Sequence, residues 1–234
     1  ALRAGKHVFV EKPLALTAEE LDQIEAFYAE TADAPVLMTG FNRRFSPAVQ
    51  TLRKRLAART APIVADYRLN AGYIPLDHWV HGPEGGGRNI GEACHVYDVF
   101  DSLTGSAVKD VRASAISPSA RLAANDNFTA TVTYDDGSLC TLTYTALGAK
   151  EHPKERLEVY GDGVVLTLDD YRSLTASGSK APLWSSRTID KGHRQELEAL
   201  AECLLRGGPW PISLEEQLRA TRISFDVEAQ IRGA

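Results

Sequence analysis

The stretch that decides the fold is residues 5–20, which read GKHVFVEKPLALTAEE. The apolar run 7–10 is typical of a buried strand, and the charged, proline-containing segment 11–13 ends it. A capping-box pattern at 17–20 predicts that a helix follows. A second apolar run at 35–40 predicts another buried strand. A strand, a helix and a strand in this order indicate part of a doubly wound parallel sheet.

The chain beyond Phe41 has a different pattern. The sequence predicts a helix from Pro47, a strand over 63–70, a loop rich in Gly and Pro over 71–87, and a helix over 89–103. From Val111 onward strands follow one another, with hairpin signals at 135–138 and 161–163 and two closing helices, 194–205 and from Ser213. Hairpins of this kind indicate a mainly antiparallel sheet, so the fold class is α/β with α+β character.

The composition excludes several classes of partner. The net charge of the 234 residues is -5, and no basic stripe suited to nucleic acid or to an anionic membrane surface is visible. No apolar run approaches the ~18 residues that a membrane span needs. The three cysteines, Cys94, Cys140 and Cys203, are scattered and in no C-x-x-C pattern, which indicates reduced thiols in a cytoplasmic protein. The expected partner is a small molecule.

Lys12 follows the first strand directly, between Glu11 and Pro13. Ligands of open α/β sheets bind outside the carboxyl ends of the strands, and a Lys pressed against an apolar cofactor can exchange protons near neutral pH. A surface lysine before a loop proline is the alternative interpretation.

A second constellation lies at 85–98, GGGRNIGEACHVYD. Three glycines before a helix allow a ligand to approach the backbone closely. At helical spacing Arg88, Glu92 and His95 share one face, with Asp98 slightly further round. Histidine is the usual base for removing a hydroxyl proton. The alternative is a polar helix face in which Glu92 satisfies His95.

Three further segments carry polar or aromatic side chains. Asn42-Arg43-Arg44 follows the second strand and is either a ligand contact or a solvated turn. The loop with Tyr73 and Trp79 suits sugar binding, or is a partly buried loop with one aromatic anchor. Residues 191–194 are expected to start a helix without binding a ligand. No metal site is predicted, because His78 and His81 have no matching carboxylates at a recognised spacing.

Three of these segments together resemble a known family. The opening ALRAGKHVFVEKP, the block GFNRRFSP at 40–47, and the block 85–98 resemble, in order and spacing, the signatures of the glucose-fructose oxidoreductase / inositol dehydrogenase / rhizopine catabolism (Gfo/Idh/MocA) family. Many members have a carboxylate four residues before the histidine, whereas this chain has Gly91 there and Glu92 one residue later. The resulting pattern Gly-Glu-x-Cys-His at 91–95 resembles that of a subgroup linked to polysaccharide or sugar-nucleotide metabolism.

The resemblance implies a division of the chain and a set of site residues. Residues 1–45 would be the end of a dinucleotide-binding Rossmann domain, and 46–234 a substrate-binding domain whose large open sheet, flanked by helices, makes homodimer or homotetramer contacts. Lys12 and His95 would be the catalytic pair in hydride transfer between NAD or NADP and a secondary alcohol of a sugar, polyol or sugar nucleotide. Contacts to the cofactor are expected from Glu11, Lys12, Pro13 and Arg44, and contacts to the substrate from Asn42, Arg43, Glu92, Asp98, Tyr73 and Trp79.

One expected element is absent from the sequence. No G-x-G-x-x-G turn for the dinucleotide phosphates occurs in it. Because the chain opens on what reads as a helix end stopped by Gly5, we expect a further segment upstream, and poor dinucleotide binding and no activity by this chain alone. Two alternatives to a dehydrogenase stay open at this point: an NAD-dependent glycosidase on the same fold, and a non-catalytic binding or oligomerisation module.

Overall fold

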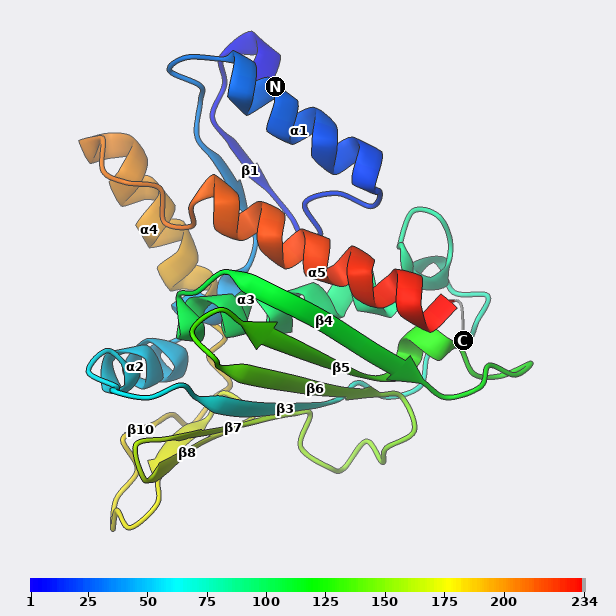
Figure 1. Cartoon of the computed structure of the whole chain (residues 1–234), viewed down its shortest axis with the longest axis vertical. Coiled ribbons are helices and arrows are strands. Elements are labelled where there is room, and N and C mark those ends of the chain that lie inside the picture. The colour runs from blue at the N-terminus through cyan, green and yellow to red at the C-terminus, as the bar shows by residue number, and fades with distance from the viewer. Residues whose placement is uncertain (233–234) are drawn as a thin grey trace.

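The computed structural model describes residues 1–232 and contains a small and a large sheet (Figure 1). In the small sheet β1 (Val8–Val10) pairs in parallel with β2 (Leu37–Thr39), and α1 (Ala18–Glu30) connects them. Thr17 caps α1, since its hydroxyl accepts the Glu20 N–H while the Glu20 carboxylate accepts the Thr17 N–H. The predicted strand–helix–strand unit and its capping box are thus confirmed.

The large sheet has eight strands in the order β10-β9-β8-β7-β3-β6-β5-β4. Only β3 and β6 run parallel, so the sheet is mainly antiparallel, as predicted. Gly137 and Gly163 have φ values of 86° and 76° in the two predicted hairpin turns, a region that glycine enters without strain. The strands are β3 (Val64–Asn70), β4 (Val108–Ala115), β5 (Asn127–Tyr134), β6 (Leu139–Thr145), β7 (Glu155–Gly161), β8 (Val164–Asp169), β9 (Ser173–Ala176) and β10 (Trp184–Ser185).

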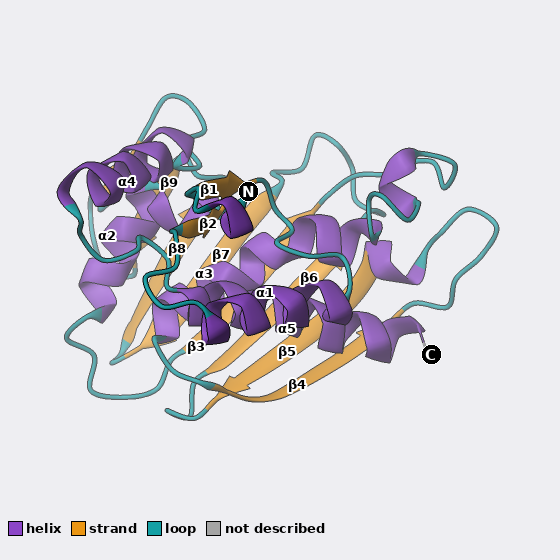
Figure 2. Ribbon diagram, turned by 90° about the horizontal axis from the view of Figure 1, so that it is seen from above, coloured by secondary structure: helices purple, strands orange, loops and turns teal. Residues whose placement is uncertain are grey.

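Helices cover one face of the large sheet (Figure 2). The apolar sides of α3 (Cys94–Thr104) and α5 (Leu214–Arg232) pack on inward-facing strand residues, and large aromatic rings such as Tyr67 and Phe100 fill the core between the two layers. The helices α2 (Pro47–Leu56) and α4 (His193–Arg206) lie at the end where β8 to β10 are found.

The small sheet is tied to the C-terminal helix. Thr39 donates its N–H and its hydroxyl to the Gln217 side-chain oxygen at 2.8 and 2.9 Å, and Gln217 donates back to the Leu37 carbonyl at 3.0 Å. Leu218 joins Leu14 in the apolar cluster beneath α1. The division into 1–45 and 46–234 therefore stays a prediction, since α5 belongs to the second segment and packs on the first.

The structure adds elements that the sequence analysis did not predict. The short strands β9 and β10 extend the sheet at its edge, and Asn89–Ala93, predicted as the first turn of an α-helix, is wound as a π-helix. Single π-turns inside helices are frequent at functional sites. No helix within residues 1–232 is both long and apolar enough to cross a membrane.

Candidate active site

A cavity of about 440 Å³ lies where the carboxyl end of β1 meets the start of the helical segment 89–104. Its wall includes Lys12 and Pro13 from the first segment and Arg43 from the turn after β2. The loop before the glycines contributes Trp79, and the helical segment contributes Arg88, Glu92 and His95. Residues from three separate parts of the sequence, 12–13, 43 and 74–95, therefore meet at one opening.

Lys12 is held by a backbone carbonyl. Its Nζ donates to the Gly91 oxygen at 2.5 Å, across 79 positions of sequence. Position 91 has little room for a side chain, because a Cβ there would lie 2.9 Å from the Gly85 oxygen. The Lys12 ammonium group is thus held by the backbone of a residue that has no side chain.

His95 borders the same cavity and is 6% exposed. Its Nδ1 is buried without a hydrogen-bond partner among residues 1–232. Its ring packs edge-on against that of Phe41, with the two ring centroids 6.2 Å apart. Burial, reinforced by the positive charges of Arg43 and Lys12, holds the pKa of His95 well below its usual value. The imidazole is therefore neutral at physiological pH, which is the form that accepts a proton.

Arg43 forms an ion pair with a fully buried carboxylate, that of Glu155. Glu155, on β7, accepts two bonds from Arg43, at 2.9 and 3.1 Å, one from Tyr67 and one from Lys191, both at 2.5 Å. Burial opposes ionisation of Glu155, but Arg43 and Lys191 outweigh it and lower its pKa to about 2. This network links the large sheet to the cavity wall. No local sequence pattern marked Glu155, because its partners lie on other elements.

Glu92 belongs to a second charged cluster at the cavity. It accepts from Lys154 at 2.7 Å, from Tyr144 at 2.5 Å and from Arg88 at 3.2 Å. Lys154 is the strongest of the groups that outweigh the effect of burial and lower the pKa of Glu92 to about 2. None of these bonds involves His95, so the alternative in which Glu92 satisfies His95 does not describe the contacts within residues 1–232.

Two predicted ligand residues pair with each other away from the cavity. Arg44, expected beside the cofactor, donates to both oxygens of Asp98, expected at the substrate, at 3.0 and 2.7 Å, and to Glu216 at 2.8 Å. Arg44 is 2% exposed and Asp98 is 0% exposed, and neither lines the cavity. An ion pair this buried gives each charge its partner within the chain. The described contacts therefore add no support to these two assignments, and both stay predictions.

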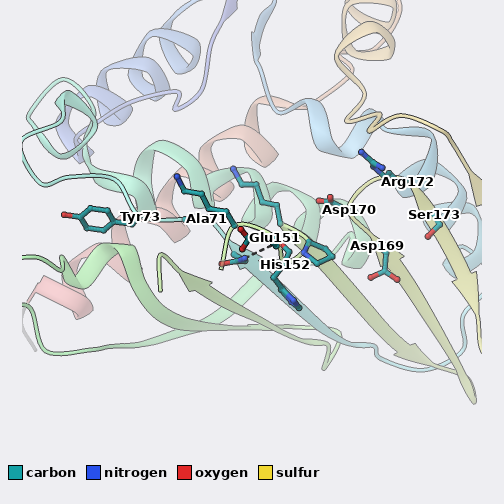
Figure 3. A pocket seen from close by; sticks show the side chains of 13 residues that line it. Ala71, Tyr73, Glu151, His152, Asp169, Asp170, Arg172 and Ser173 are labelled. Atoms are coloured by element: carbon teal, nitrogen blue, oxygen red, sulfur yellow. Dashed lines mark hydrogen bonds between the residues drawn. The ribbon is translucent and has the colours of Figure 1, made fainter. Parts of the chain in front are cut away.

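Of the predicted residues that remain, Trp79 lines the cavity, whereas Asn42, Glu11 and Tyr73 do not. Trp79 is at its rim and 64% exposed. Asn42 is buried and donates to the Lys191 carbonyl at 2.9 Å, behind Arg43. Glu11 is exposed and its carboxylate lies over Gly40. Tyr73 lines a different, larger cavity, which Figure 3 shows.

Glu196, in the first turn of α4, is a buried carboxyl group near this region. It is 3% exposed, and burial, with the nearby charges of Glu11 and Asp98, raises its pKa to about 8 from a usual 4.5. The folded state therefore keeps a proton that the unfolded chain releases near pH 4.5. Since the unfolded state binds fewer protons in this interval, the stability contributed by this group falls as pH rises from about 4.5 to about 8.

The variant Glu196→Gln removes this linkage. As pH rises through that interval, we expect the free energy of unfolding of this variant to increase relative to that of the wild type by up to about 1.4 kcal/mol for each pH unit. Urea unfolding at pH 5, 6.5 and 8 measures the difference. The control Glu198→Gln, in the same helix with a side chain 60% exposed, should track the wild type. Parallel stability profiles for Glu196→Gln and the wild type would contradict the assignment of a buried neutral carboxyl.

The chain has an α/β fold in which a lysine at the end of a parallel strand and a neutral histidine at a helix start line one cavity. The description "GFO/IDH/MocA C-terminal domain" matches residues 61–167. Two curated relatives align over nearly the whole chain: "Uncharacterized oxidoreductase YrbE" of Bacillus subtilis, 25% identical over 96% of this chain and 68% of the relative, and myo-inositol 2-dehydrogenase of Thermotoga maritima, 26% identical over 95% and 70%.

A solved structure of the same fold is UDP-N-acetylglucosamine 3-dehydrogenase GnnA from Acidithiobacillus ferrooxidans, with a TM-score of 0.80 and 22% identity over 99% of this chain and 72% of that chain. Residues 61–167 are thus similar to the C-terminal domain of the Gfo/Idh/MocA proteins, in agreement with the resemblance that the three sequence blocks carry. Biliverdin reductase from Synechocystis sp. PCC 6803, solved in complex with biliverdin and NADP+, has the same fold, with a TM-score of 0.76 and 23% identity over 100% of this chain and 74% of that chain.

Proposed function

We propose that this chain provides the substrate-binding and proton-transfer part of an NAD(P)-dependent oxidoreductase acting on a secondary alcohol of a sugar, polyol or sugar nucleotide. The observation that carries the proposal is that Lys12 and the neutral His95 border one cavity of about 440 Å³. That volume is in the usual range for small-molecule sites. The lining combines the aromatic Trp79 with charged side chains, a mixture suited to a polyhydroxyl compound.

The residues described fit the reactive end of the cofactor only. Lys12 and Pro13 border the cavity at the end of β1, where ligands of parallel sheets bind, whereas the sequence holds no glycine-rich turn for the phosphates. Lys12 and Pro13 would therefore flank the nicotinamide ring, with Glu11 as their neighbour. When bound, the nicotinamide supplies a carbon atom that accepts or donates a hydride.

The proton steps follow from the protonation states at the cavity. In oxidation, the neutral His95 takes the proton of the substrate hydroxyl, the carbon loses its hydride, and the C–O bond becomes a carbonyl. Lys12 donates a hydrogen bond to the same oxygen and stabilises the negative charge that develops on it. Arg43, held by Glu155, and Glu92, held by Lys154, would orient the other hydroxyl groups.

The test is hydride transfer in the full-length protein that contains this sequence. Inositols, hexoses and UDP-sugars, each deuterated at one carbinol carbon, are incubated with NAD or NADP. Deuterium at C4 of the nicotinamide together with a ketone product is the expected result. Release of a free sugar from a glycoside without accumulation of reduced cofactor would indicate the glycosidase instead. Sugar binding with no deuterium transfer from any substrate would indicate the non-catalytic module.

We also propose that two copies associate through the uncovered face of the large sheet. The helices α3 and α5 lie on one side of β3 to β6 and no helix lies on the other side (Figure 1). Exposed threonines such as Thr129 and Thr143 are directly opposite each other on β5 and β6. The double variant Thr129→Arg/Thr143→Arg places like charges opposite each other on this face. Sedimentation velocity should then show a smaller particle than for the wild type. An unchanged sedimentation coefficient would argue against this surface.

A further inference from the structure

We propose that the cavity beside Tyr73 binds a second sugar ring, so that the substrate is a glycoside larger than one monosaccharide. This inference rests on the proposed function, because it extends the sugar site at Lys12 and His95. The second cavity has a volume of about 880 Å³ and lies between the end of β3, the segment 150–154 and the turn joining β8 to β9 (Figure 3).

The two cavities share a thin wall. Lys154 lines the second cavity, and its Nζ bonds at 2.7 Å to Glu92 of the first. Arg88 of the first cavity donates to the carbonyl oxygens of Gly72 and Ala71, which line the second, at 2.6 and 3.2 Å. The Lys154 side chain is 40% exposed and that of Glu92 is 22% exposed, so the edge of this wall faces solvent. A ligand with two linked rings can therefore cross it.

The charges of the second cavity favour a neutral ligand. Three cations line it, Lys150, Lys154 and Arg172, together with three carboxylates, Glu151, Asp169 and Asp170. A diphosphate would need an excess of cations and would meet these carboxylates at close range. A sugar ring, by contrast, donates hydrogen bonds to carboxylates and accepts them from lysine and arginine.

Tyr73 and Asn70 also shape this cavity. The Tyr73 side chain lies at one end of the cavity and is 44% exposed, so its ring is free to stack on the apolar face of a pyranose (Figure 3). Asn70, 7% exposed, donates from its amide nitrogen to the carbonyl oxygens of Ala149 and His152 at 2.8 and 3.3 Å. These bonds hold the segment that carries Lys150 and Glu151 at the border of the cavity.

Sugar binding to the full-length protein that contains this sequence, measured without cofactor, tests this inference. Calorimetry compares glucose, galactose and N-acetylglucosamine with cellobiose, lactose and N,N′-diacetylchitobiose, and saturation-transfer NMR shows which ring contacts the protein. At least one disaccharide should bind about tenfold more tightly than its monosaccharide. Tyr73→Ala and Arg172→Ala should each remove most of that gain and leave monosaccharide affinity unchanged. Tyr160→Ala, an equally exposed tyrosine on the large sheet, is the matched control and should change neither affinity.

The outcomes separate this inference from the proposed function. Monosaccharide binding with no gain for any disaccharide overturns the second-ring site and leaves the proposed function standing. Equal losses for both ligand classes in Tyr73→Ala also overturn it. If UDP-N-acetylglucosamine binds more tightly than every disaccharide and Arg172→Ala weakens that binding, the second cavity takes an anionic group. This result overturns the inference of a neutral second ring. The absence of binding by any sugar contradicts the proposed function itself.

Discussion

Replacing His95 by Asn is expected to slow hydride transfer by about 10²–10⁴-fold, the range that a positioned general base contributes. Asparagine keeps the size and polarity of the side chain but cannot take the hydroxyl proton. Since the neutral imidazole assists the chemical step, kcat should fall more than KM rises. Single-turnover reduction of the cofactor in the full-length protein measures the step directly.

The pH dependence supplies an independent signature. Because burial and the neighbouring cations lower the pKa of His95, the wild type should keep its activity when pH falls through the range where an ordinary histidine protonates. In the wild type, activity should fall only at lower pH, where His95 becomes protonated. In His95→Asn this fall should be absent from the pH–rate profile. His78→Asn, on the exposed part of the loop, is the control and should retain wild-type kinetics. Full activity in His95→Asn would end the assignment of the base.

Lys12→Met adds a second test of the same cavity. If Lys12 and His95 act on one oxygen, the double variant should be little slower than the slower single variant, because groups that act together are not additive. If the rate loss of the double variant equals the product of the two single losses, Lys12 and His95 do not act on the same oxygen.

Replacing Glu155 by Gln is expected to destabilise the fold by about 3–5 kcal/mol, the usual cost of leaving a buried charge without its partner. Arg43, at 5% exposure, would lose its carboxylate, and Tyr67 and Lys191 would lose the same acceptor. Urea unfolding near pH 7 measures the loss. Glu158→Gln, on the same strand and paired with Arg156 at the surface, should cost less than about 1 kcal/mol.

Acid titration gives the sign of the Glu155 contribution. Its pKa is lowered to about 2 from a usual 4.5, so its stabilisation is present above pH 4.5 and disappears as pH falls toward 2. Glu155→Gln should therefore lose less stability than the wild type between pH 4.5 and 2. Equal costs for Glu155→Gln and Glu158→Gln at pH 7 would show that the buried network does not stabilise the fold.

Local sequence determined the elements whose energetics are local. The capping box at Thr17 and the hairpin turns at Gly137 and Gly163 depend on residues that are near neighbours in the chain. For this reason their positions were predicted within a few residues. The family signatures added Lys12 and His95, which the structure brings to one cavity, whereas their catalytic roles stay a prediction.

Only the tertiary structure decided which polar groups are paired. Helical spacing set Asp98 near His95, but packing against η2 (Asn42–Phe45) and α5 instead buried Asp98 in an ion pair with Arg44. Glu155 lies 112 positions from Arg43, and Gly91 lies 79 from Lys12, so no local pattern could join them. The sequence by itself determined the strands, turns and helices, because these depend on short-range backbone preferences. The site depended on burial and long-range pairing of charges, which exist only once the sheet and helices have packed.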